Sequence, residues 1–279
     1  ILHPFNQANL DAAQPAIQCD KPIKCVAVDT ETEGLEAVSH RIVEISVRPF
    51  LFDPQTGAIE SHKEHAYHGL QDPGVPLDED IKRITHLTDA ELKGQQIDWQ
   101  RVFDMICEAQ LVVAHNASFD RRFVETEVYR WDQKKVVEPK FVKKLWGCSL
   151  HGIDWSNLEP PSKALQVLCW MHGFFPENAH RAYDDTAMLL RMLQLSGRMS
   201  ELWLNAHLPA CEIWADGSPY ESKDRLSGHG YRWFKERKCW MKVVLLSDTE
   251  TELAWLKQQY GYMKFAARVD SLAAWQRYK

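Results

Sequence analysis

Two kinds of apolar pattern alternate along the first 200 residues. Residues 25–28 and 111–114 are continuous apolar runs, as in strands that are buried on both faces. Residues 41–52 alternate apolar and polar positions, as in a half-buried strand, and residues 59–67 are a candidate third strand. Apolar positions of helical period cover residues 99–108, 119–129, 162–172 and 183–195. This order predicts a layered α/β domain.

A second, smaller unit is predicted near the C-terminus, because the pattern weakens after residue 197. Pro209 and the stretch ADGSP are typical of a boundary. Ser218, Pro219 and Glu221 then have the spacing of a helix start with a capping box. A strand at GYRW, a strand at KCWMKVVLL and a helix from SDTETE follow. We divide the chain into an N-terminal extension (1–23), an α/β domain (24–198), a linker (199–217) and a small α+β module (218–279).

Composition narrows the class of protein. The 279 residues are 45% hydrophobic, which is enough for a sizeable core. The net charge of -6 excludes a uniformly basic surface but leaves room for a local basic patch. The seven cysteines are scattered and form no Cys-x-x-Cys pair, which disfavours disulfides and zinc and favours a reducing, cytoplasmic setting. No run has the roughly 18 apolar residues of a membrane span and no signal peptide is visible, so no membrane partner is expected. Because the chain begins with Ile1, removal of an earlier segment stays open.

The first buried run ends in a cluster of acids. In VAVDTETEGL, Asp29, Glu31 and Glu33 follow the apolar residues of the strand. Carboxylates this close together raise one another's pKa and are costly unless a cation or a proton lies between them. The stretch therefore indicates a metal site.

Two further segments bring acids to the ends of elements. LVVAHNASFD ends with Asp120, and HRAYDDT opens a helix with His180 and two aspartates. Two hard cations on carboxylates beside a histidine suit phosphoryl hydrolysis: one ion lowers the pKa of a bound water, both stabilise the pentacovalent oxygens, and the histidine accepts the proton. Taken alone, the stretch with Asp29 also fits a solvated strand end, the stretch with Asp120 also fits a capped helix start, and His180 also fits a surface histidine. The three together favour the metal site.

Helical spacing distinguishes the two adjacent aspartates of HRAYDDT. Asp185 shares a helix face with Met188, Leu189 and Met192, toward the sheet, whereas Asp184 aligns with Ala187 and Arg191. Asp185 is therefore the predicted ligand.

At these residues the chain resembles a known family. D-x-E, H-N-x-x-F-D and H-x-A-x-x-D, within residues 24–196, resemble the three motifs of the DEDDh exonucleases, the family of bacterial polymerase proofreading subunits. ITHLTDAEL resembles the segment that follows the third strand in that family, and CSLHGIDW is similar to a stretch in its bacterial polymerase-epsilon-like members. The resemblance implies a ribonuclease H-like mixed five-stranded sheet flanked by helices, and stepwise 3′ to 5′ removal of nucleotides with two Mg²⁺ or Mn²⁺ ions.

The resemblance also implies roles for particular residues. Asp29, Glu31 and Asp185 would hold one ion, Asp29 would share the second with Asp120, and His180 would be the general base. The implied substrate-binding residues are Thr30, Gly34, Leu35, His86, Leu87, Asn116 and Phe119. Leu35, Leu87 and Phe119 would contact the terminal bases, although ordinary core positions remain the alternative.

Two neighbouring positions have other readings. Thr88 and Glu91 have the spacing of a capping box and predict a helix start. Glu33 departs from the family pattern, in which many members carry threonine, and adds negative charge beside the site.

The expected ligand is nucleic acid with a single-stranded or frayed 3′ end. An acidic site repels phosphates until metals bind, so binding would draw on unpaired bases and on cations such as Arg121, Arg122 and those of KKVVEPKFVKK, although that lysine run also fits a solvated surface. DNA is favoured over RNA, a choice that depends on contacts to the 2′-hydroxyl. A polymerase or another protein is a candidate partner. The alternative function is a non-catalytic nucleic-acid-binding or polymerase-docking module, which the filled catalytic positions disfavour.

The C-terminal module carries a local basic patch. Residues 221–245 hold seven basic and three acidic residues. Tyr231, Trp233, Phe234 and Trp240 are interleaved with the cations on a predicted hairpin. This mixture fits bases that stack while phosphates are neutralised. It equally fits the core of a unit of about 60 residues, and both readings stay open.

Overall fold

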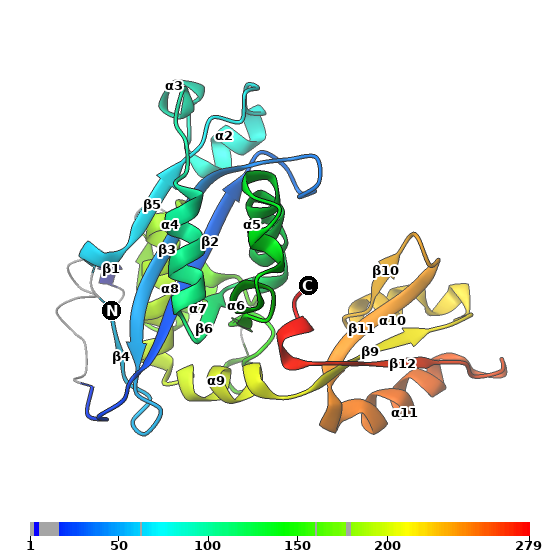
Figure 1. Ribbon diagram of the computed structural model, residues 1–279. Helices are drawn as coiled ribbons and strands as arrows, with labels where there is room; N and C mark the ends of the chain where they lie inside the picture. The colour runs from blue at the N-terminus through cyan, green and yellow to red at the C-terminus, as the bar shows by residue number, and fades with distance from the viewer. Residues whose placement is uncertain (1–2, 6–16, 62, 160, 177–179) are drawn as a thin grey trace. The chain divides into compact units, whose positions relative to one another are not determined.

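The computed structural model describes residues 3–5, 17–61, 63–159, 161–176 and 180–279 (Figure 1). The chain forms two compact units: unit 1 is Ile1–Ala206 with Tyr278–Lys279, and unit 2 is His207–Arg277. Among the described residues, no helix combines the length and apolar character that crossing a membrane requires. Most of the predicted N-terminal extension lies outside the described residues.

Unit 1 is built on a mixed six-stranded sheet. Its strands, in spatial order, are β4 (Ile59–Glu60), β3 (Ile42–Phe52), β2 (Ile23–Thr32), β6 (Leu111–Ala114) and β7 (Leu145–Cys148), and β5 (Tyr67–Leu70) also pairs with β3. β2 is antiparallel to β3 and parallel to β6, which is parallel to β7. The mixed sheet is as predicted. It has six strands rather than five because the stretch expected as one strand near residues 59–67 provides two short ones.

Helices cover both faces of this sheet. Those of unit 1 are α2 (Glu79–Thr85), α3 (Asp89–Leu92), α4 (Trp99–Glu108), α5 (Ala117–Trp131), α6 (Pro139–Val142), α7 (Leu165–Met171), α8 (Ala182–Ser196) and α9 (Met199–His207). Cys25 and Ala27 of β2 belong to a core cluster with α7, α8 and α9, whereas Val26 and Val28 belong to one with α4 and α5. Burial on both faces explains the continuous apolar run. A separate short pair joins β1 (His3–Phe5) and β8 (Phe174–Pro176).

One strand is more buried than its sequence predicts. Alternation of polar residues in β3 predicts a half-buried strand, yet Glu44, Ser46 and Arg48 have no exposed surface. They are buried because they bind α8 instead of water. The Ser46 Oγ lies 2.9 Å from the Thr186 Oγ1. Arg48 donates from Nη2 to the Tyr183 carbonyl at 3.3 Å.

The predicted capping box at Thr88 is confirmed. The Thr88 Oγ1 accepts from the Glu91 backbone N–H at 3.3 Å, and the Glu91 carboxylate accepts from the Thr88 N–H at 2.8 Å. Because reciprocal bonds of this kind satisfy two donors that a helix start leaves open, α3 begins where the sequence indicates.

Unit 2 is an antiparallel sheet with two helices. The strand order is β10 (Arg232–Phe234), β11 (Cys239–Leu245), β9 (Ala210–Ala215) and β12 (Arg268–Leu272), and the helices are α10 (Lys223–Gly228) and α11 (Thr249–Gln259). β10 and β11 form the predicted hairpin.

The start of unit 2 differs from the sequence interpretation. Residues 199–217, expected as a linker, contain α9 and β9, and β9 is an inner strand of the unit 2 sheet. Ser218 does not cap a helix: its N–H bonds to the Ala215 carbonyl at 3.3 Å, and α10 begins at Lys223 after a short 3-10 turn. Pro209 lies close to the start of unit 2 at His207, whereas ADGSP contains a turn inside the unit.

Candidate metal centre

The end of β2 directs alternate side chains to opposite faces of the sheet. Asp29 and Glu31 continue the face of Cys25 and Ala27, which packs against α8. Thr30 points to the other face, where its Oγ1 donates to the Asp120 Oδ1 at 2.9 Å. The strand thus contacts acids from two different helices.

The other groups come from the N-terminal ends of α5 and α8. Asp120 lies in the first turn of α5 and Asp185 in the first turn of α8, and both are buried. His180 is exposed just before α8, with a left-handed φ of 65°. Three possible ligand atoms lie within 4.8 Å of one another, one each from Glu31, His180 and Asp185. The fold therefore brings the end of β2 and the start of α8 to one place, and the bond from Thr30 to Asp120 adds the start of α5.

The start of α8 is fixed by a fully buried acid on β3. Glu44, directly opposite Glu31 in the ladder, accepts from the Arg181 Nε at 3.2 Å and from the Ala182 N–H at 3.3 Å. The His68 Nε2 lies 2.6 Å from the Glu44 Oε1. Because Arg181 and Ala182 follow His180 directly, Glu44 limits how far the histidine can move. The sequence pattern assigned Glu44 to a polar face and gave it no role.

The clustered carboxyls raise one another's pKa. For Asp29, burial and then the charges of Asp185 and Asp120 raise the pKa well above its ordinary value. Burial, with Asp185 and Glu44 next in size, raises the pKa of Glu31 to about 9. Burial raises the pKa of Asp120, and also of Asp185, to about 7. Such shifts mark a site that favours either protons or cations.

The residues fit a divalent cation. The carboxylate oxygens of this cluster are the kind of donor suited to Mg²⁺ or Mn²⁺. In addition, the Asp185 Oδ1 is buried without a hydrogen-bond partner among the described residues. A buried carboxylate oxygen that lacks a donor is stabilised by a cation.

The raised pKa values predict how stability depends on pH and metal. A carboxyl whose folded pKa exceeds its unfolded value holds its proton more tightly when folded, so the free energy of unfolding falls as pH rises from about 4 through 7 to 9. In EDTA, these groups should therefore lower the melting temperature at pH 8 relative to pH 5.5. Mg²⁺ at about 100 times its Kd should raise it by about 5 °C or more at pH 8, and by less at pH 5.5. Thermal unfolding followed by circular dichroism measures both, and an equal metal effect at the two pH values would contradict the prediction.

The expected substrate-binding residues divide into two groups. Leu35 is 73% exposed, and Phe119 is partly buried against Phe123 with ring centres 4.8 Å apart. By contrast, Leu87 is completely buried with Val43 and its neighbours, so the structure places it in the core. Leu35 and Phe119 are thus accessible to a ligand, and Leu87 is not.

The remaining candidates sit at element ends. Asn116 precedes α5 and is partly exposed, and His86 ends α2 with a left-handed φ of 58°. His86 is exposed and lines a cavity of about 320 Å³ whose other lining residues are Glu44, His68, Arg181, Tyr183 and Asp184. At Gly34, a Cβ would come within 2.5 Å of the His40 ring, so packing already requires glycine there.

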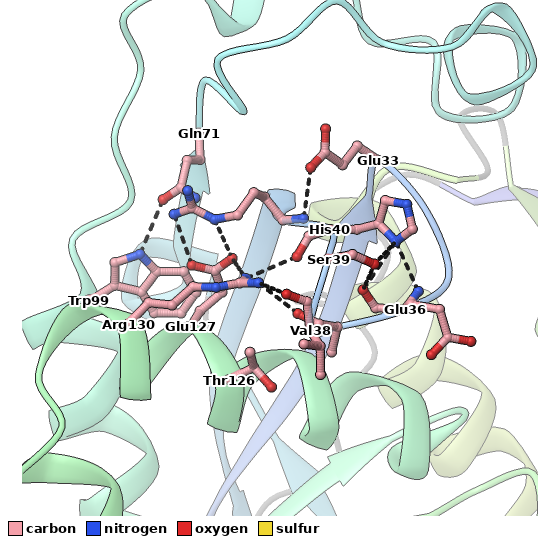
Figure 2. A network of polar contacts seen from close by, with 12 residues as sticks. Glu33, Glu36, Val38, Ser39, His40, Gln71, Trp99, Thr126, Glu127 and Arg130 are labelled. Atoms are coloured by element: carbon pink, nitrogen blue, oxygen red, sulfur yellow. Dashed lines mark hydrogen bonds and ion pairs between the residues drawn. The ribbon is translucent and has the colours of Figure 1, made fainter.

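Glu33 is not part of the acidic cluster. The ladder register shifts between Glu31 and Thr32, which breaks the alternation that would align Glu33 with Asp29. Its carboxylate instead accepts from the Arg41 backbone N–H at 3.0 Å (Figure 2). The departure from the family pattern therefore adds a bond that closes the β2–β3 loop.

The β2–β3 loop, residues 33–41, is held to α5 by a set of ionic contacts that we call the loop brace: Arg41, Glu127 and Arg130 (Figure 2). The buried Glu127 carboxylate accepts from the Arg41 Nε and the Arg130 Nη1, both at 2.7 Å. Arg130 also donates to the carbonyls of Ala37, Val38 and His40 at 2.8 to 2.9 Å. The brace joins the loop that carries Leu35 to the helix that carries Phe119.

Two of the expected phosphate-binding cations serve the fold instead. Arg121 has no exposed surface, and its Nε donates to Glu125 at 2.7 Å. Lys144, the end of the lysine run, is buried and donates to the carbonyls of Cys107 and Ala109. Arg122 is exposed. Helical position decides the case of Arg121, which shares a face with the buried Val124 and Val128.

Comparison with known proteins adds the family. Residues 26–193, more than half of the chain, match the exonuclease family RNase_T. DNA polymerase III PolC-type of Lacticaseibacillus paracasei is 29% identical over 194 residues, which are 66% of this chain and 12% of that protein. The PolC-type polymerase of Streptococcus pyogenes is 30% identical over 117 residues, 41% of this chain and 7% of that protein. The chain thus spans a small part of the length of these relatives.

Solved structures show a similar fold. A structure of exonuclease I has a TM-score of 0.55 at 14% identity and covers 91% of this chain and 63% of its own. The zinc-bound complex of E. coli ExoI with single-stranded DNA has a TM-score of 0.53 at 16% identity and covers 90% and 63%. The family match includes the motifs whose side chains meet at the end of β2. This chain is therefore a member of the RNase_T exonuclease family, and its acidic motifs are those of the DEDDh-type 3′–5′ exonucleases.

Proposed function

We propose that this chain removes nucleotides one at a time from the 3′ end of single-stranded or frayed DNA, using two divalent cations and a histidine base. The observation that carries the proposal is the convergence of three acidic segments at the end of β2, with a buried Asp185 oxygen that lacks a donor among the described residues. Structural acids rarely collect at such a cost unless a cation offsets their repulsion.

The roles follow from position. Asp29, Glu31 and Asp185 would hold one ion, and Asp29 and Asp120 the other. Bound Mg²⁺ or Mn²⁺ would lower the pKa of the attacking water and offset the charge of the phosphate. His180 is exposed beside Glu31 and Asp185, where its imidazole would accept a proton from that water. Thr30 keeps Asp120 oriented through its 2.9 Å bond.

Two observations support a single-stranded 3′ end as substrate. The exposed Leu35 and the accessible Phe119 belong to elements that the loop brace joins, and apolar side chains of this kind contact unpaired bases. The related ExoI structure is a complex with single-stranded DNA. A polymerase remains the candidate partner, because the PolC-type relatives are polymerases.

The test is a nuclease assay with Mg²⁺ or Mn²⁺ on a 5′-labelled oligonucleotide, in DNA and RNA versions of one sequence. We expect a ladder that shortens from the 3′ end, faster on DNA, and none in EDTA. Circular single-stranded DNA, which has no 3′ end, should stay intact. Folded protein that binds the oligonucleotide but leaves it uncut with either metal would favour the non-catalytic module instead.

A further inference from the structure

The sheet of unit 2 has two different faces. Cys211, Ile213 and Ala215 of β9 pack with Leu226 of α10 and Leu256 of α11 in one core cluster. Both helices of the described unit 2 therefore cover the same face. Residues at the alternate positions of the strands lie on the opposite face.

The aromatic residues expected to stack on bases lie mostly on the covered face. Tyr231 is 2% exposed in the unit 2 core, and Trp240 packs against that core. Lys242, one of the cations of the predicted basic patch, donates to Glu252 at 2.7 Å. The interpretation of these residues as core is therefore the better one. Trp233 remains half exposed beside Trp240.

The opposite face carries a row of cations. Strand register aligns Arg232, Met241, Trp214 and Arg268 across all four strands. Arg232 and Arg268 are exposed, as is Arg237 in the β10–β11 turn. We call Arg232, Arg237 and Arg268, with Trp214 and Met241 between them, the arginine face.

Trp214 orients two of these guanidinium groups. The Cζ atoms of Arg237 and Arg268 lie 4.3 and 5.1 Å from the centre of its ring. The indole itself is 3% exposed, and its N–H has no hydrogen-bond partner among the described residues. The buried ring therefore holds the two guanidinium groups in place rather than contacting a ligand itself.

The charge of this face is concentrated at one end. Lys235 and Lys238 are exposed in the same turn as Arg237. On the same face, Glu212 and Asp270 form the row next to that of Trp214 and Arg268. Arg268 contacts Asp270 at 3.2 Å. The chain as a whole has a net charge of -6, so cations gathered near the hairpin form a local positive patch. Such a patch is complementary to the negative charge of phosphates.

We propose that the arginine face binds the phosphodiester backbone of single-stranded nucleic acid. Guanidinium groups held over an indole present their N–H donors to phosphate oxygens with less freedom of movement, which lowers the entropy lost on binding. Unpaired bases can stack on the same planar groups, whereas a duplex hides its bases. The choice of nucleic acid as ligand rests on the proposed function.

Anisotropy of a labelled dT20 oligonucleotide, titrated with the full chain in EDTA, tests this proposal. Without metal the acidic centre repels phosphates, so the remaining affinity reports other surfaces. The variant Arg232→Gln/Arg237→Gln should raise Kd about tenfold or more and reduce the slope of log K against log salt by about 1.4, since each phosphate contact on a single strand contributes about 0.7. The control Arg225→Gln/Lys257→Gln removes the same charge from α10 and α11 and should change Kd less than about twofold. Equal weakening in both variants, or none, would overturn the proposal.

A second variant covers the risk that Arg237 is needed for folding. Arg232→Glu changes an exposed residue and should weaken dT20 binding at least as strongly as loss of charge alone. Hydrolysis of thymidine 5′-monophosphate p-nitrophenyl ester with Mn²⁺ should be unchanged in all these variants, because this substrate is too short to need a second site. If wild type binds dT20 through the arginines but cleaves nothing, the proposed function fails alone. If it cleaves and Arg232→Glu binds normally, the arginine face fails alone.

Discussion

Replacing Asp185 with asparagine is expected to reduce nucleotide release by about 10³-fold or more, whereas Asp184→Asn keeps most of it. Asp185 is 7% exposed, lies within reach of Glu31 and His180, and has an oxygen without a donor in the described part of the chain. Its neighbour Asp184 is partly exposed and lines the cavity with His86. Asparagine keeps the shape of aspartate but removes a charge that a cation needs, and a lost metal ligand is worth several kcal/mol of transition-state stabilisation.

The paired variants separate catalysis from folding. Because Asp185 is one of several buried acids that repel each other, Asp185→Asn should melt no lower than wild type in EDTA at pH 8 and should gain less stability from Mg²⁺. Initial rates on the 5′-labelled oligonucleotide and melting curves measure the two effects. Comparable loss of activity in both variants, with intact melting transitions, would show that the ligand is assigned to the wrong aspartate.

His180→Gly is expected to reduce turnover by about 10² to 10⁴ while leaving metal affinity little changed, the usual loss for a positioned general base. Glycine is the better substitution because it adopts the left-handed φ of 65° without strain, whereas alanine would add a backbone cost of about 1 kcal/mol. Rates at saturating Mg²⁺ give the effect on turnover, and the Mg²⁺ dependence of melting gives the affinity.

The pH profile distinguishes a base from a structural residue. A general base acts only in its unprotonated form and so contributes to the fall of the rate on the acid side. The glycine variant should lose this contribution and keep only the part that comes from the carboxylates. Wild-type turnover in the variant, or an unchanged acid side, would show that His180 only supports the loop before α8.

The positions of the candidate metal ligands could be predicted because their signals are local. Each acid follows an apolar run or opens a helix, so strand and helix periods alone placed Asp29, Asp120 and Asp185 at element ends. The bounds of α4 and β6 coincide with the predicted ranges for the same reason. That these acids would meet in space was predicted from the order of the motifs along the chain, which resembles that of the family.

What could not be predicted depends on contacts between segments far apart in sequence. Glu44 reads as a solvent-facing residue of an alternating strand until its bonds to Arg181 and Ala182, 137 and 138 positions away, are known. Arg121 reads as a free cation until its helix face is seen to be buried. The strand at Ala210–Ala215 is bounded by turn residues so closely that the whole segment resembled a linker.

The loop brace has a consequence for how this domain can diversify. Arg130 and Glu127 anchor the base of the β2–β3 loop, but Leu35 and Val38 project from it with 73% and 88% of their surface bare. Residues at the tip can therefore be exchanged without disturbing the acids at the end of β2. A directed-evolution library aimed at new substrates should randomise the exposed residues Leu35, Glu36 and Val38. It should leave the loop brace unchanged, so that every member keeps the acidic site and differs only in the surface offered to the substrate.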